Sequence, residues 1–134
     1  MNMNRVSHLT IGTATVLAVA IGCYAAILDG THGTVKVTPN TATADKGEKE
    51  FQDTLSFADG KFSSAFFGAK GFKSAVYRGE KEANEAEFEA EQTNDTGGVL
   101  NWQGEIRGAR IAGRLMWMKK DSPAFTYTFQ GTTE

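Results

Sequence analysis

Hydrophobic and polar residues alternate along short runs through most of the chain. Residues 51–57 (FQDTLSF) and 85–93 (EAEFEAEQT) repeat with a period of two, as a half-buried strand requires, because successive side chains point to opposite faces of a sheet. Alanine and glutamate favour helices, but the strict alternation of 85–93 favours a strand with its four glutamates facing water. Strands are predicted near residues 34–38, 50–57, 61–67, 73–78, 85–93, 98–107, 110–118 and 124–131.

Turn signals separate these runs. Asp59-Gly60 predicts a two-residue type I′ hairpin turn, because Asp and Gly tolerate the positive φ that both central positions need. Such a turn leaves one register, with Phe57 opposite Phe62, Leu55 opposite Ser64, and Asp53 opposite Phe66. Residues 39–49 read as a loop with one helical turn, and residues 68–71, 79–84 and 94–98 as turns.

The segment 101–117 (NWQGEIRGARIAGRLMW) carries glycines in an otherwise strand-like sequence. Gly108 suits the first central position of a type II′ hairpin, which requires positive φ. This turn places Ile106 opposite Ile111, Gly104 opposite Gly113, Trp102 opposite Leu115, and Leu100 opposite Trp117. Aromatic side chains often cover strand glycines in curved sheets. We therefore expect Phe88 beside Gly104, Phe129 beside Gly113, and Phe125 opposite Trp117.

Eight antiparallel strands joined mostly by hairpins predict an all-β, eight-stranded up-and-down barrel, because closure removes exposed strand edges. The alternative is a β-sandwich, which has the same alternation. The layout resembles the calycin group of lipocalins and avidins in three stretches: residues 28–31 (LDGT) leading into a strand, 102–104 (WQG), and 111–117 (IAGRLMW). The resemblance implies the barrel fold and an interior ligand, but it transfers no ligand-contacting residue to this chain.

The inward positions of the predicted strands form the candidate ligand-binding interior. Mostly apolar walls with a few polar groups are typical of a small-molecule pocket, but an eight-stranded barrel is also just wide enough for its own side chains to fill. Asp53 has three interpretations. It is a structural acid, either buried and bonded to Ser64 or Tyr127 or lying at the barrel rim in another register, or it orients a ligand, or, least favoured, it is a catalytic carboxylate. The candidate residues are Asp53, Phe57, Phe62, Ser64, Phe66, Phe88, Gln92, Trp102, Trp117 and Tyr127.

The N-terminus predicts a location outside the cytoplasmic membrane. Leu9 to Leu28 contains no charged residue and follows a short polar stretch with Arg5, the layout of an export signal or a membrane anchor. Residues 20–23 (AIGC) resemble a bacterial lipobox, in which Cys23 would be lipidated. An uncleaved anchor and ordinary cleavage near Gly22 or Ala25 are the alternatives. We therefore divide the chain into a signal or anchor (1–28) and a β-barrel domain (29–134), either tethered on the periplasmic side of the cell envelope or secreted.

Composition argues against most chemistry. The formal net charge is −2, without the clustered basic surface that nucleic acid binding needs. The histidines are His8, inside the N-terminal segment, and His32, and Cys23 is the single cysteine. These residues predict no metal site, no catalytic residues and no cofactor.

We therefore expect a non-enzymatic, envelope-tethered barrel that binds a small apolar or amphiphilic molecule. The alternative is a ligand-free structural or protein-interaction module of the bacterial envelope. An acidic region (80–91) and a later basic hairpin could dock a neighbouring envelope protein through complementary charge. Outward Met116 and Met118 beside Arg114 would lie in such a contact.

Overall fold

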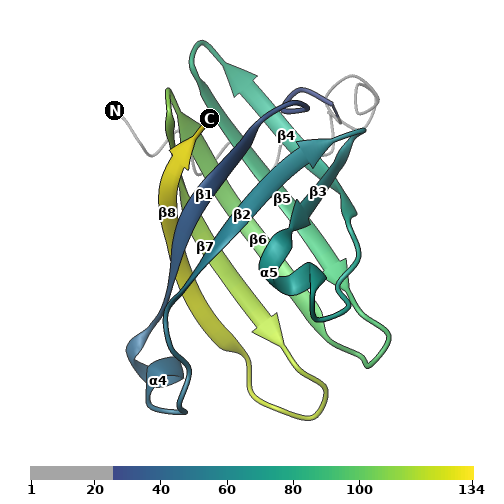
Figure 1. The fold of residues 1–134 in the computed structure, drawn as a ribbon, viewed down its shortest axis with the longest axis vertical. Helices are drawn as coiled ribbons and strands as arrows, with labels where there is room; N and C mark the ends of the chain where they lie inside the picture. Colours follow the sequence, from purple (N-terminus) through teal and green to yellow (C-terminus); the bar gives the residue numbers. More distant parts are fainter. Residues whose placement is uncertain (1–25) are drawn as a thin grey trace.

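Eight antiparallel strands close into a barrel in which each strand pairs with the next and the last pairs with the first (Figure 1). This computed structural model describes residues 26–134. The predicted barrel is confirmed, and the sandwich alternative is set aside. The strands are β1 (His32–Pro39), β2 (Phe51–Ala58), β3 (Lys61–Ser64), β4 (Ala75–Glu82), β5 (Glu85–Thr93), β6 (Val99–Arg107), β7 (Arg110–Met118) and β8 (Phe125–Thr133). Two short helices, α4 (Thr41–Ala44) and α5 (Ala65–Gly68), follow β1 and β3.

The registers that the turns predicted are present. Asp59 and Gly60 have φ of 55° and 73°, as a type I′ turn requires. Gly108 has φ of 57°, and Ala109 is not among the positive-φ residues, which fits type II′. The confirmed pairs are Phe57 with Phe62, Leu55 with Ser64, Ile106 with Ile111, Gly104 with Gly113, Trp102 with Leu115, and Leu100 with Trp117.

One inward-facing row of the barrel wall places phenylalanines directly beside glycines on the neighbouring strands. Phe88 pairs with Gly79 on one side and Gly104 on the other, and Phe129 pairs with Gly113. An added Cβ at Gly104 would lie 2.6 Å from Cζ of Phe88. The predicted covering of glycines by aromatic rings is therefore confirmed, as is the pairing of Trp117 with Phe125.

Two predicted elements are wrong. The strand predicted for 61–67 ends at Ser64, and Phe66 lies in α5 instead of opposite Asp53. The Ser64 side chain accepts a hydrogen bond from the N–H of Phe67, so it acts as a helix N-cap where the strand stops. The other error is in β4, which runs to Glu82 through Gly79, so the expected turn over 79–84 shrinks to the two residues after Glu82.

Because β3 ends early, the barrel wall is weakly paired between β2, β3 and β4. We call this part of the wall the seam. β3 and β4 share two residue pairs, whereas β5 and β6 share nine. Residues 51–54 of β2, which precede Leu55, have no strand partner on the β3 side. The helix α5 covers this part of the barrel (Figure 1). The seam is where the fold departs most from a regular barrel.

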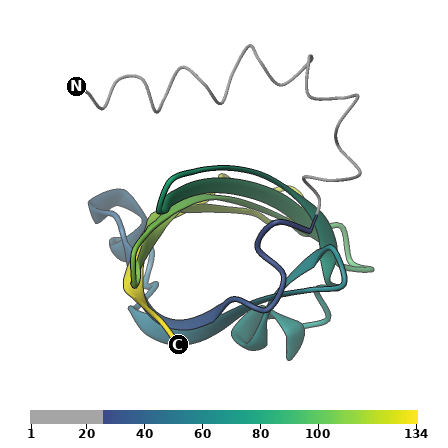
Figure 2. The same cartoon turned by 90° about the horizontal axis from the view of Figure 1, so that it is seen from above.

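The barrel has two distinct ends. The chain enters at residues 26–31, which lie with the turns at 59–60, 83–84 and 108–109; we call this the entry end (Figures 1 and 2). The loops at 39–50, 94–98 and 119–124 lie at the other end, the far end. Within residues 26–134, no helix is long and apolar enough to cross a bilayer. Most of the predicted signal or anchor, including Cys23 and the lipobox, lies outside the described residues.

Candidate functional site

The predicted interior residues converge inside the barrel, except Phe66, which lies in α5 at the seam. All are buried except Phe66 and Trp117, which are half-buried. Their rings contact one another across the barrel: Phe62 and Trp102 have centroids 5.1 Å apart, and Trp102 and Phe129 5.5 Å apart. These ring contacts run from β2 and β3 through β6 to β8, so large side chains pack against one another across the barrel interior.

The sequence reasoning missed several core residues. Phe67 from α5 is fully buried and packs edge-on against both Trp102 and Trp117, with centroids 6.0 Å and 5.1 Å away. Phe72, from the segment after α5, is also buried and lies edge-on to Phe67. The segment after β3 therefore contributes two buried aromatic rings, Phe67 and Phe72, to the interior. The cluster of aromatic residues at 66–72 was the available signal, but only the helix at α5 turns Phe67 inward.

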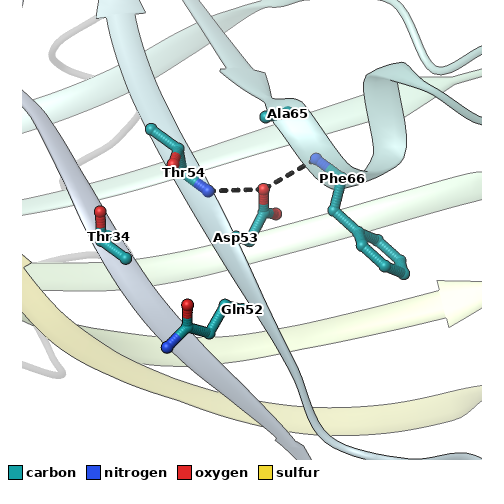
Figure 3. A pocket seen from close by; sticks show the side chains of 6 residues that line it. All are labelled: Thr34, Gln52, Asp53, Thr54, Ala65 and Phe66. Atoms are coloured by element: carbon teal, nitrogen blue, oxygen red, sulfur yellow. Dashed lines mark hydrogen bonds between the residues drawn. The ribbon is translucent and has the colours of Figure 1, made fainter.

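Asp53 is the buried acid of the candidate site, and its carboxylate bridges the seam (Figure 3). One oxygen, Oδ1, accepts the backbone N–H groups of Thr54 at 2.7 Å and Phe66 at 2.9 Å. The other, Oδ2, accepts the hydroxyl of Ser64 at 2.5 Å. Had β3 continued in register, its next residue would have faced Thr54. The carboxylate thus replaces ladder hydrogen bonds that the early end of β3 removes.

Burial raises the pKa of Asp53 above its usual value of 3.8, and the hydrogen bonds from Ser64, Phe66 and Thr54 oppose that rise. Removal from water therefore outweighs the hydrogen-bond donors around the carboxylate. Of the two partners expected for a buried Asp53, Ser64 is bonded to it, whereas Tyr127 donates its hydroxyl to Glu48 at 2.9 Å.

The remaining interior polar groups are also hydrogen-bonded within the protein. The Gln92 side chain accepts the indole N–H of Trp102 at 2.8 Å and donates to the carbonyl of Lys73 at 2.9 Å. Burial and the bond to Glu48 raise the pKa of Tyr127, so its hydroxyl remains a donor at neutral pH. Over residues 26–134, the one buried side-chain atom without a partner is Oε1 of Glu87, on the outer face.

A surface pocket of about 300 Å³ opens at the seam, outside the aromatic core (Figure 3). Its walls come from the outer faces of β1 and β2 and from the start of α5. Asp53 is its buried carboxylate, and the ring of Phe66 stacks on Phe51 with centroids 3.8 Å apart. The lining residues are Thr34, Gln52, Asp53, Thr54, Ala65 and Phe66.

The outer face of β4–β6 is acidic, and its four β5 glutamates are less exposed than expected. Glu85, Glu87 and Glu89 are half-buried, and only Glu91 is exposed. Glu87 lies between Glu80 and Glu105 on the neighbouring strands. Burial, followed by the charges of Glu80 and Glu105, raises the pKa of Glu87 to about 7. Like charges directly opposite one another destabilise a sheet.

We expect Glu87→Gln to stabilise the protein above pH 7. A raised pKa means that the folded state gains stability from the proton below the unfolded pKa of 4.5 and loses it as pH rises through about 7. Glutamine removes this loss, so urea unfolding should show a gain of about 1 kcal/mol at pH 8.5 and little change at pH 4. Glu91→Gln, on the same strand but exposed, is the control. Equal effects at both pH values for Glu87→Gln would contradict this prediction.

The fold and site define an up-and-down antiparallel barrel of eight strands with an aromatic core and a seam pocket. Within residues 26–134, no group of three His, Cys, Asp or Glu side chains is placed to hold a metal ion. The chain matches no family model, no curated protein and no solved structure.

Proposed function

We propose that this protein is a non-enzymatic barrel, tethered at the cell envelope, that acts through its outer surface as a structural or protein-interaction module. A single observation carries the proposal. The polar side chains of the interior, Asp53, Ser64, Gln92 and Tyr127, are already hydrogen-bonded within the protein. A ligand-binding interior needs polar groups that are free to orient a ligand, so this arrangement favours a packed core.

The surface and the N-terminus support the other parts of the proposal. The uncharged segment Leu9–Leu28 and the lipobox-like residues 20–23 favour a tether. On the outer face of β7, Met116 is 40% exposed and lies two residues from the exposed Arg114. Together with the acidic face of β4–β6, this surface offers a partner protein both charge and apolar contact.

A lipocalin-like role in binding a small molecule is the second candidate, and the seam pocket favours it. Its volume of about 300 Å³ is at the lower end for a small-molecule site. Polar side chains of Thr34, Gln52, Asp53 and Thr54 share the lining with the apolar surface of Ala65 and Phe66, so the pocket suits a small amphiphilic ligand better than a purely apolar one.

Native mass spectrometry of protein extracted from membranes in mild detergent separates the two candidates. The proposal expects the mass of the polypeptide with any lipid on Cys23, no additional small molecule, and a fraction in complex with another protein. A small molecule released in a one-to-one ratio would overturn it.

To locate such a ligand, Thr54→Trp would block the seam pocket. Thr128→Trp, equally exposed on β8, is its control.

A further inference from the structure

The structure fixes where the N-terminal segment leaves the barrel. Leu28 is buried in the core, and its N–H donates to the hydroxyl of Tyr77 on β4 at 2.9 Å. The same hydroxyl donates to Oδ1 of Asp29 at 2.9 Å. Both carboxylate oxygens of Asp29 accept the N–H of Gly60 in the β2–β3 turn, at 3.1 Å and 2.9 Å. We call these contacts the entry latch.

Further contacts hold the same segment. The N–H of Gly30 donates to the carbonyl of Phe57 at 2.8 Å, and the N–H of Phe57 donates to the carbonyl of Thr31 at 2.9 Å. Ile27 packs against the core beside Gly79 on β4. Burial raises the pKa of Tyr77 to about 12, so its phenol stays protonated at physiological pH. The segment is thus fixed to two separate parts of the wall and cannot swing as a free linker.

The chain beyond the latch is short. Leu28 lies five positions after Cys23, and this stretch spans at most about 18 Å when fully extended. A strand of nine residues such as β5 is about 30 Å long. An attachment at or after Cys23 therefore reaches the entry end but leaves too little chain for the barrel to turn its far end toward the same membrane.

We propose that the entry end is a membrane-facing surface, held against the phospholipid headgroups of the bilayer in which the N-terminal segment is anchored. The inference rests on the tether in the proposed function. Lys61, Lys81 and Arg110 lie at this end, where they can meet headgroup phosphates, although Asp59 and Glu82 lie among them. The length of chain and the latch, rather than net charge, therefore carry the argument.

Fluorescence quenching in vesicles tests this orientation. The full chain, extracted from membranes, is reconstituted into phosphatidylethanolamine and phosphatidylglycerol vesicles that contain a spin-labelled headgroup lipid. A fluorophore is attached through Ala109→Cys at the entry end or Ala44→Cys at the far end, both exposed positions. Quenching at position 109 should exceed that at position 44 at least threefold. The wild-type chain, labelled in the same way, reports any reaction at Cys23.

The outcomes separate this inference from the function on which it rests. If the labelled proteins do not float with the vesicles, the tether is wrong, and the inference falls with it. If they float but show equal quenching, or stronger quenching at position 44, the tether stands and the orientation is wrong.

The latch has its own variant pair. Tyr77→Phe removes the hydroxyl that joins Leu28 to Asp29 and keeps the ring, so the quenching ratio should fall at least twofold. Tyr127→Phe removes the hydroxyl bonded to Glu48, which is not part of the latch, and should leave the ratio unchanged. Equal ratios for Tyr77→Phe and the wild type would show that the latch does not orient the barrel.

Discussion

Gly113→Ala is expected to lower the free energy of unfolding by about 3 kcal/mol, the upper range for overpacking a core. An added Cβ at this position would overlap the carbonyl oxygen of Gln103 and approach Cα of Gly104 at 2.6 Å and Cζ of Phe129 at 2.7 Å. The first two are backbone atoms of the paired strand β6. They cannot withdraw without breaking the ladder between β6 and β7.

Gly68→Ala is the matched control, because an added Cβ there meets no atom within 4 Å and Gly68 lies in α5 without a positive φ. Alanine should be neutral or slightly stabilising at this position, since it is the better helix former. Urea unfolding of both variants gives the comparison. Equal midpoints for Gly113→Ala and the wild type would mean that the two strands are farther apart than described.

Asp53→Ala is expected to destabilise the protein by about 3 kcal/mol or more. The change leaves the N–H groups of Thr54 and Phe66 without their acceptor and removes the partner of the Ser64 hydroxyl. A fully buried group left unsatisfied costs about 1–3 kcal/mol; the Ser64 hydroxyl is buried, and the two backbone groups, which are partly buried, add less each. Hydrogen exchange should show that the backbone amides of β3 and α5 lose protection first, because β3 has the shortest strand pairing in the barrel and α5 follows it directly.

Asp53→Asn tests the charge separately from the hydrogen bonds. Its amide oxygen can still accept from Thr54 and Phe66, so the variant should be far more stable than Asp53→Ala. Because burial raises the pKa of Asp53, the folded wild type gains stability from the proton at low pH and loses it as pH rises through the folded pKa. The free energy of unfolding of Asp53→Asn should therefore increase relative to that of the wild type as pH rises from 3 to 7. A difference that stays constant with pH would contradict this account.

The hairpin registers could be predicted because a two-residue turn leaves one pairing for the strands beside it. Asp59-Gly60 and Gly108 are residue types that such turns select for their positive φ. The same logic failed at β4. Gly79 was interpreted as a turn residue, yet it lies in the strand beside Phe88, and the positive φ falls on Ala83, at 56°. Alanine is not a residue type that turns select for positive φ, so the sequence did not indicate Ala83 as the turn residue.

The seam could not be predicted from alternation. Phe62, Ser64 and Phe66 continue the period of two, so the pattern extends the strand past its true end at Ser64. A serine N-cap followed by a glycine at the end of a short helix was the available signal, but one helical turn has no hydrophobic period of its own. The latch was equally hidden, because Asp29 and Tyr77 are distant in sequence and meet only when the barrel closes.

The pairing of β1 with β8 over seven residues also governs how the chain must be made. Until the final strand is in place, the nascent protein is an open sheet whose edges at β1 and β7 have unsatisfied backbone groups. Synthesis therefore passes through a stage in which these open edges can pair with other molecules and aggregate. A product that terminated early, before Phe125, would lack β8 and keep both edges open.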